Sequence, residues 1–207
     1  EAYWYMKNII GMDNDEMSAR FSEWNQGLNS YLMEITAEIL GKIDEETGSH
    51  LIDKILDTAE QKGTGKWTVQ EALEIGVPVP TISAALVARF ISARKEQRIK
   101  NSKKFDFKYE NNYETEGHLN GLRKALNLTT ISSYLQGMNL LSKASEEHEY
   151  DLDLGTVAMI WKDGCIIRSD LLDPIQKVFQ GDDHVDNLMF VEPFISQFKE
   201  GVEGLRS

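Results

Sequence analysis

The most unusual local composition in the chain is Gln61-Lys62-Gly63-Thr64-Gly65-Lys66-Trp67-Thr68. Two glycines two positions apart allow backbone conformations that other residues rarely adopt, and they let the backbone approach a ligand closely. Two lysines and two threonine hydroxyls surround the glycines, so positive charge and hydrogen-bond donors converge as they do in anion-binding turns. The stretch does not match the nucleotide-binding pattern G-x-x-x-x-G-K-[ST], because Lys66 is followed by Trp67. Composition alone favours an anion site and a solvated lysine-bearing loop about equally.

A second basic residue favours the anion site. We predict one helix over Pro80–Arg98, with Thr81 as its N-cap after a proline-rich break. Its apolar residues recur with a period near 3.6 and are Ile82, Ala85, Leu86, Phe90 and Ala93. Arg89 follows Leu86 by three residues and is therefore predicted to lie inside this stripe. An arginine on the core side pairs with an anion or extends to water. With the glycine-lysine turn upstream, we predict that Arg89 and this turn share an anion.

Composition limits the other partners of the chain. Its 207 residues are 41% hydrophobic and 27% charged, which is ordinary for one globular domain with room for part of a second. The 22 basic and 34 acidic residues give a net charge of −12, which disfavours binding to nucleic acids or anionic membranes. No apolar run approaches the roughly 18 residues of a membrane span. An anion site must therefore be a local positive region within a chain of opposite net charge.

The remaining reactive side chains suggest structural roles. Cys165 is the only cysteine, so an intrachain disulfide is excluded and a reducing compartment such as the cytoplasm is expected. Its apolar neighbours predict a buried, inert thiol. We expect Arg168 to pair with Asp170 or Asp173. Four histidines without metal-ligand spacing are predicted to lie on the surface, and no metal is expected: His50, His118, His148 and His184.

Hydrophobic periodicity predicts an all-α fold. The expected helices cover residues 2–10, 13–24, 28–41, 51–56, 67–73, 80–98, 118–145, 171–179 and 187–205. Residues 101–117 are predicted to form a long surface loop, although the alternation of Phe105, Phe107 and Tyr109 also suits a short strand. Residues 156–167 remain ambiguous on pattern alone, because the Asp163-Gly164 pair is typical of a hairpin turn.

The region around the basic turn closely resembles the signature of the 6-phosphogluconate dehydrogenase family. The matching residues read Ile55-x-Asp57-x-x-Glu60-Gln61-Lys62-Gly63-Thr64-Gly65-Lys66-Trp67. Further blocks follow in the family's order: Trp24-Asn25-Gln26-Gly27, Ser30 to Thr36, Gly76 to Pro80, Ser133 to Gly137 and Trp161 to Ser169. The resemblance spans nearly the whole chain but only the middle of the family's sequence. Departures are Glu60, where Gly or Ala is usual, Gln97, Thr129-Thr130 and a one-residue shortening before Tyr31.

The resemblance implies an architecture. Residues 1–207 would be part of the all-α C-terminal domain of this family, truncated at both ends, with short helices rather than a hairpin over residues 156–167. The family's Rossmann domain, which binds NADP, would be absent, and the sequence indeed lacks the G-x-G-x-x-G pattern of such a domain. Homodimers form through the helical domain in this family, so large apolar faces are expected to stay exposed in a single chain.

The resemblance also implies an activity, the oxidative decarboxylation of 6-phosphogluconate to ribulose 5-phosphate and CO₂ with reduction of NADP, a step of the pentose phosphate pathway. Lys62 and Arg89 match the positions that hold the substrate phosphate. The family's catalytic lysine and glutamate would lie before Glu1, so no catalytic, cofactor-binding or metal-binding residue is expected here, and the chain alone is expected to be inactive. The residues by themselves leave open an alternative, a helical anion-binding or protein-interaction module without catalysis.

Overall fold

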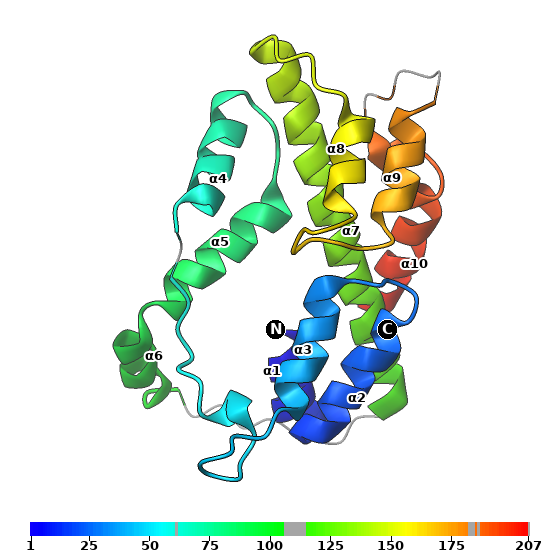
Figure 1. Ribbon diagram of the computed structural model, residues 1–207. Coiled ribbons are helices and arrows are strands. Elements are labelled where there is room, and N and C mark those ends of the chain that lie inside the picture. Colours follow the sequence, from blue (N-terminus) through cyan, green and yellow to red (C-terminus); the bar gives the residue numbers. More distant parts are fainter. Residues whose placement is uncertain (61, 106–114, 182–184, 186, 207) are drawn as a thin grey trace. The chain divides into compact units, whose positions relative to one another are not determined.

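A computed structural model describes residues 1–60, 62–105, 115–181, 185 and 187–206, with only the backbone described at 205 and 206. These residues are helical apart from loops and one isolated antiparallel bridge between Ile43 and His50, which confirms the predicted all-α class (Figure 1). No helix among them is long and apolar enough to cross a membrane. The chain divides into two compact units. Unit 1 comprises Glu1–Ile55, Tyr109–Leu128 and Asp153–Ser207, and unit 2 comprises Leu56–Lys108 and Thr129–Leu152.

The first helices of unit 1 begin and end where their sequences predict. Helix α1 (Ala2–Tyr5) continues into a π-helical turn (Met6–Ile10), which Gly11 ends in the left-handed conformation at φ 84°. Helix α2 (Asn14–Asn25) begins with a capping box, in which the Asp13 carboxylate accepts from the Glu16 backbone N–H at 2.8 Å. The Glu16 carboxylate accepts from the Asp13 N–H at 2.9 Å in return. Two backbone donors that the helix leaves unpaired are thereby satisfied.

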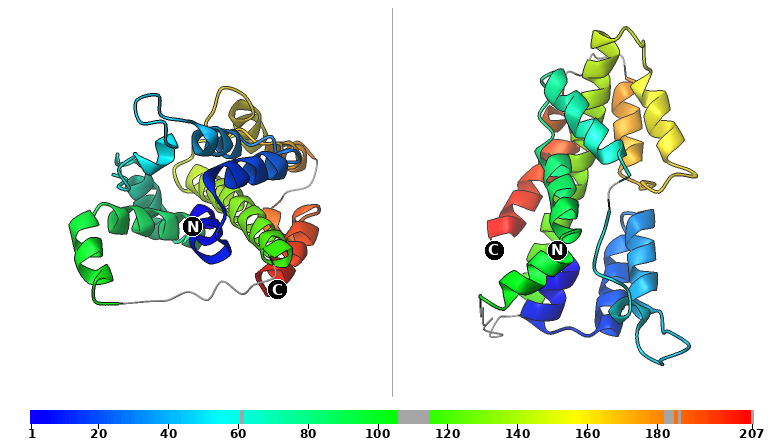
Figure 2. Two further views of the ribbon diagram at one scale, coloured as in Figure 1. Left: turned by 90° about the horizontal axis from the view of Figure 1, so that it is seen from below. Right: turned by 90° about the vertical axis from the view of Figure 1, so that its left-hand side faces the viewer.

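Helix α3 (Tyr31–Gly41) packs beside α2, as two further views show (Figure 2). It buries Ala37 and Leu40, whereas its apolar residues Leu32 and Ile39 are 47% and 38% exposed. Together the first helices and the start of α7 (Thr115–Glu147) form one hydrophobic cluster of buried residues: Met6, Met17, Phe21, Trp24, Ala37, Leu40 and Leu119.

The rest of unit 1 is also helical. The segment predicted as a helix over residues 51–56 forms only a 3₁₀ turn, Leu51–Asp53. Helix α8 (Leu154–Trp161) packs against α9 (Leu172–Phe179). The hairpin interpretation of residues 156–167 is wrong, because α8 occupies the first half of this range. The expectation of short helices there is confirmed for α8 alone, since residues 162–167 form turns and bends. The predicted helix over 187–205 is divided into a 3₁₀ turn (Leu188–Phe190) and α10 (Phe194–Arg206). Pro193 explains the division, because proline disfavours the helical conformation of the residue before it.

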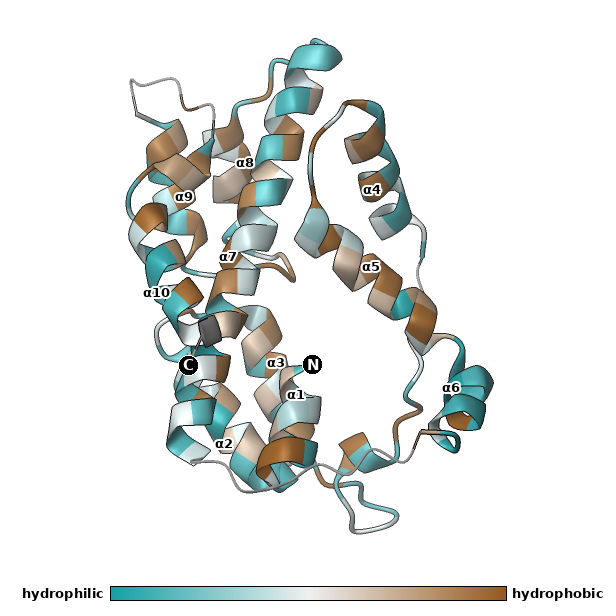
Figure 3. Ribbon diagram, turned by 180° about the vertical axis from the view of Figure 1, so that it is seen from behind, coloured by the Kyte–Doolittle hydropathy of each residue, from teal (hydrophilic) through white to brown (hydrophobic). Residues whose placement is uncertain are grey.

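Unit 2 contains α4 (Thr64–Glu74), α5 (Pro80–Ser92), α6 (Lys95–Ser102) and the later part of α7. Its hydrophobic cluster comprises Ala72, Val77, Val79 and Leu140, with Val69, Ile75 and Ile82 packed against it. Figure 3 shows hydrophobic residues along α5, whereas α6 is mostly hydrophilic. Much of the α5 surface remains unburied, because Val87, Phe90 and Ile91 are exposed.

The single helix predicted over Pro80–Arg98 is wrong in two respects. The helix breaks after Ser92, where Arg94 adopts φ −95° and ψ 49°, and α6 begins at Lys95. Thr81 is also not its N-cap, because Val79 precedes Pro80 at the first helical position. The first N–H groups instead donate to a distant side chain: the Thr81 N–H reaches Gln136 Oε1 at 3.0 Å. A cap supplied from 55 residues away leaves no local signal in the sequence.

The long helix predicted over residues 118–145 is confirmed and slightly longer, as α7. The surface loop predicted over residues 101–117 is shorter than expected, because α6 extends to Ser102 and α7 begins at Thr115. Residues 106–114, which include the possible strand with Phe107 and Tyr109, lie outside the described residues.

Gly201 gives a test of the packing of unit 1, with Gly137 of unit 2 as the control. A Cβ added at Gly201 of α10 would meet the Leu128 Cβ at 2.7 Å, whereas a Cβ at Gly137 of α7 would meet nothing within 4 Å. Gly201→Ala should lower the free energy of unfolding by about 1–3 kcal/mol through overpacking. Gly137→Ala should raise it by up to about 1 kcal/mol through helix propensity. Urea unfolding followed by circular dichroism measures both; equal effects would contradict the α7–α10 contact.

Candidate functional site

The basic turn is the start of a helix. Helix α4 begins at Thr64, three residues before the predicted start at Trp67, with Gly63 as its N-cap at φ 111°. The Trp67 ring lies against this glycine, and a Cβ at position 63 would meet the ring at 3.3 Å. A positive φ and a close aromatic neighbour thus both require glycine here.

This placement aims an electropositive helix end at the solvent. The N–H groups of the first turn, Thr64 to Lys66, have no acceptor within the helix, and the helix dipole makes this end favourable for anions. Lys62 immediately precedes the cap and is exposed. Its ammonium group forms no ion pair with any other described residue. The predicted anion site therefore has a free cation beside free backbone donors.

Arg89 reaches the same segment from the last turn of α5. Its guanidinium Nη2 donates to the backbone carbonyl oxygen of Glu60 at 2.5 Å, two residues before Lys62. The expectation that Arg89 faces the core is wrong, since its side chain is exposed while Leu86 forms the buried face of α5. The structure thus places Arg89 against the backbone near Lys62. It does so from the exposed face of α5 and not from the buried stripe that the periodicity indicates.

Arg168 offers a contrast. Its guanidinium donates to Asn29 Oδ1 at 2.7 Å and to Glu34 Oε2 at 2.5 Å, so a carboxylate balances its charge. The prediction that Arg168 pairs with a carboxylate is confirmed, but the partner is Glu34 rather than Asp170 or Asp173. Arg89, by comparison, has a neutral carbonyl as its recorded partner and no carboxylate among the described residues. A guanidinium without a counter-charge is the better candidate for an exogenous anion.

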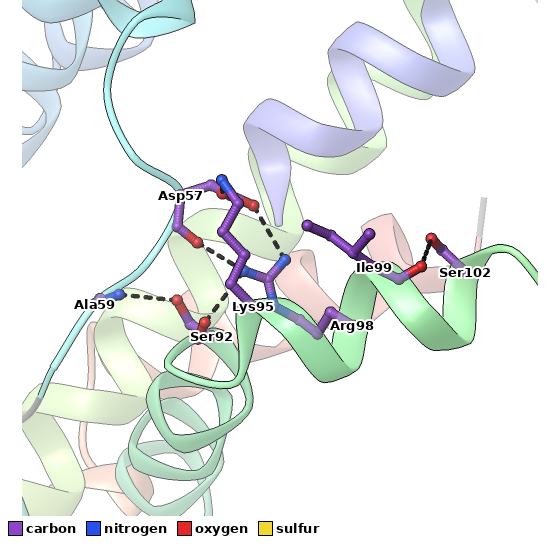
Figure 4. A network of polar contacts seen from close by, with 7 residues as sticks. All are labelled: Asp57, Ala59, Ser92, Lys95, Arg98, Ile99 and Ser102. Atoms are coloured by element: carbon purple, nitrogen blue, oxygen red, sulfur yellow. Dashed lines mark hydrogen bonds and ion pairs between the residues drawn. The ribbon is translucent and has the colours of Figure 1, made fainter.

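Figure 4 shows a network of polar contacts around Asp57, which lies in the chain segment that leads to Lys62. The Asp57 carboxylate forms ion pairs with Lys95 and, at 3.1 Å, with Arg98 Nη1. Arg98 Nη2 also donates to the Asp57 carbonyl oxygen at 2.8 Å. The Ala59 N–H donates to Ser92 Oγ at 3.0 Å. Sequence reasoning missed this network, because its partners lie more than 30 residues apart and on either side of an unpredicted helix break.

Other candidate groups form ordinary structural contacts. His50 contacts Asp15 at 3.0 Å, His118 Nδ1 contacts the Tyr5 hydroxyl at 2.5 Å, and His148 contacts Glu71 at 2.7 Å. His50 and His118 are half-buried, in contrast to the expected surface placement, and His184 lies outside the described residues. Cys165 is half-buried rather than buried. No group of metal-binding side chains occurs among the described residues.

A groove of about 410 Å³ lies between α2 and α3. It is lined by serines together with Glu34 and Glu38 and by no cationic residue. Two carboxylates and no cation make it unsuited to an anion. The electropositive start of α4 therefore remains the best candidate functional site.

The chain is a helical domain in which a lysine-bearing helix start, from Lys62 to Lys66, is exposed to solvent. The model of the family described as 6-phosphogluconate dehydrogenase, C-terminal domain, matches residues 1–207. The chain belongs to this family.

Relatives and a solved structure support the assignment to this family. The chain is 44% identical to "6-phosphogluconate dehydrogenase, decarboxylating" of Lactococcus lactis subsp. cremoris over 212 residues, which cover 100% of the chain and 44% of the relative. It is 44% identical to the Bacillus subtilis protein "6-phosphogluconate dehydrogenase, NADP(+)-dependent, decarboxylating", over 99% of the chain and 44% of the relative. A structure of Plasmodium falciparum 6-phosphogluconate dehydrogenase superposes with a TM-score of 0.92 at 43% identity, over 99% of this chain and 45% of the other. The chain therefore spans less than half the length of these relatives.

The Asp57 network has a measurable signature. The Lys95 ammonium and the Arg98 guanidinium lower the pKa of the Asp57 carboxyl from 3.8 to about 2. A folded-state pKa below the ordinary value means that this carboxylate stabilises the fold above pH about 4 and that the contribution is lost as the pH falls toward 2. Carbon-13 NMR should show the Asp57 carboxyl titrating near pH 2, and Arg98→Met should raise that midpoint toward the ordinary value. An unchanged midpoint in Arg98→Met would contradict the pairing.

Proposed function

We propose that the protein containing this chain oxidatively decarboxylates 6-phosphogluconate to ribulose 5-phosphate with NADP as the oxidant, and that this domain binds the substrate phosphate through Lys62 and Arg89. Membership of the family and the names of relatives that are 44% identical support the reaction. The observation that carries the site assignment is the hydrogen bond from Arg89 to the Glu60 carbonyl oxygen, which brings a second cation beside Lys62.

The chemistry of the two side chains suits a phosphate monoester. Lysine supplies a point charge on a flexible stem, whereas arginine supplies a planar fork of donors that fits two phosphate oxygens. The Arg89 Nη2–Glu60 bond uses one of five guanidinium donors, so the others remain for a ligand. The first N–H groups of α4 add donors without any cost in side-chain ordering. Holding the phosphate orients the sugar acid, so that remote binding energy contributes to the reaction at the other end of the substrate.

The residues of this chain do not fit the NADP itself. A dinucleotide site of the Rossmann type needs a strand followed by a glycine-rich turn and a helix, and the described residues form no such strand. We therefore assign NADP to the complete protein and derive no step through it here. The name of the Bacillus subtilis relative, which describes it as NADP(+)-dependent, supports this cofactor.

Removal of either cation should weaken substrate binding. In the complete protein, Lys62→Ala and Arg89→Ala should each raise the KM for 6-phosphogluconate about ten- to a hundredfold, since a charged hydrogen bond contributes about 1.5–3 kcal/mol. The double variant should lose less than the sum of the two effects, because both side chains contact one group. Steady-state kinetics with circular dichroism as a check of folding measures this.

Lys66 provides the matched control for this experiment. It belongs to the same turn and is equally exposed, but it lies within the first turn of α4, beyond the Gly63 cap. Lys66→Ala should raise the KM less than Lys62→Ala does. If Lys62→Ala and Arg89→Ala both leave the KM unchanged while the protein stays folded, this helix start is not the phosphate site.

We further propose that the helical domain associates with a second copy. Exposed apolar residues on α5 and neighbouring helices of unit 2 support this: Leu73 is 77% exposed, Ile91 55%, Val87 50% and Phe90 40%. Exposed apolar side chains gathered on neighbouring helices are typical of interaction sites.

The association gives a direct expectation for the mass in solution. Light scattering at micromolar concentration should report a dimer or a larger species, because a monomer would leave this apolar surface in water. A strictly monomeric mass across the micromolar range would contradict the proposed interface without affecting the phosphate site.

A further inference from the structure

The segment that carries Lys62 has little regular structure to hold it. Between the 3₁₀ turn that ends at Asp53 and the cap of α4 at Gly63, the described residues form no helix or strand. Backbone groups in such a segment need partners from side chains or water. The partners that the structure records come largely from α5 and α6, so these helices decide where the segment lies.

Three side chains hold successive points of this segment. Arg98 donates to the carbonyl oxygen of residue 57 at 2.8 Å, Ser92 accepts from the N–H of residue 59 at 3.0 Å, and Arg89 donates to the carbonyl oxygen of residue 60 at 2.5 Å. Arg89 and Ser92 are three residues apart on α5 and therefore share a face. The segment is thus fixed in register along the end of α5, and the last point of attachment precedes Lys62 by two residues.

Asp57 connects this arrangement to the helix break. Its carboxylate binds Lys95 and Arg98, the two basic residues that face it from the start of α6. Arg98 Nη2 in turn donates to the Ser92 carbonyl oxygen at 3.1 Å, at the end of α5. One carboxylate therefore orients the arginine that ties the segment to α5 and closes the bend between α5 and α6 (Figure 4).

We propose that Asp57 is a positioning residue for the phosphate site: by holding Arg98, it fixes residues 57–60 along α5 and so places Lys62 beside Arg89. The proposal rests on the proposed function of Lys62. Asp57 itself need not touch the substrate, and its negative charge is balanced by two cations, so it does not repel a phosphate. Because Asp57 restricts the segment before the substrate binds, Lys62 loses less conformational entropy on binding.

The test is a double-variant cycle in the complete protein. Asp57→Asn keeps the size of the side chain but removes the charge that binds Lys95 and Arg98. It should raise the KM for 6-phosphogluconate about three- to tenfold, through weakened charged hydrogen bonds, with kcat less affected. In a Lys62→Ala background the same change should have little further effect on the KM, because the residue being positioned is gone. A purely structural role would give equal effects in both backgrounds.

Two further variants make the result decisive. Asp53→Asn is the matched control, because Asp53 lies in the same connection and is also ion-paired, to Lys7 at 2.7 Å, but it does not contact α5 or α6 among the described contacts. It should leave the KM unchanged. Ser92→Ala removes the acceptor of the Ala59 N–H and should also raise the KM, by less than Asp57→Asn does. This second variant keeps the proposal testable if Asp57→Asn does not fold.

The outcomes separate this proposal from the phosphate assignment. If Lys62→Ala raises the KM but Asp57→Asn and Ser92→Ala do not, or if Asp57→Asn acts equally with and without Lys62, the positioning role is wrong and the phosphate site stands. If Lys62→Ala itself has no effect, the phosphate assignment fails and the positioning role fails with it.

Discussion

The ion pairs of Asp57 with Lys95 and Arg98 are the interaction on which the proposed site depends. A segment without regular structure has many conformations, and each residue that is fixed loses about 1–2 kcal/mol of backbone entropy. Here a carboxylate between two cations directs one guanidinium to two backbone carbonyl oxygens, one on the segment and one at the end of α5. The break between α5 and α6 is therefore part of the site, because a continuous helix would not return Arg98 toward Asp57.

The electrostatics of the chain make a local arrangement necessary. With a net charge of −12, the chain as a whole repels a phosphorylated sugar acid. The proposed site at the start of α4 combines three favourable features: Lys62 has no ion pair with another described residue, Arg89 binds the neutral Glu60 carbonyl, and a helix N-terminus supplies backbone donors. Arg168, in contrast, is balanced by the Glu34 carboxylate. Charge compensation thus distinguishes Arg168 from Arg89.

Local patterns in the sequence predict the helices well. They fail where contacts with residues far away in the chain determine where a helix begins or ends. The Asp13 cap, the Gly11 end and the long helix α7 follow from short-range rules that the structure confirms. The break after Ser92 and the cap of α5 by Gln136 depend on residues far away in the chain, so periodicity missed both.

The candidate site shows the same division. The sequence predicts that Lys62 and Arg89 bind one anion. The structure brings Arg89 to the backbone near Lys62, but from an exposed face rather than from the predicted buried stripe.

The most direct test of the proposed phosphate site is a crystal structure of the complete protein with 6-phosphogluconate bound. The account predicts that the phosphate oxygens lie within hydrogen-bond distance of Lys62 Nζ, the Arg89 guanidinium and the first N–H groups of α4. A phosphate bound elsewhere, with Lys62 and Arg89 both free of it, would contradict the account.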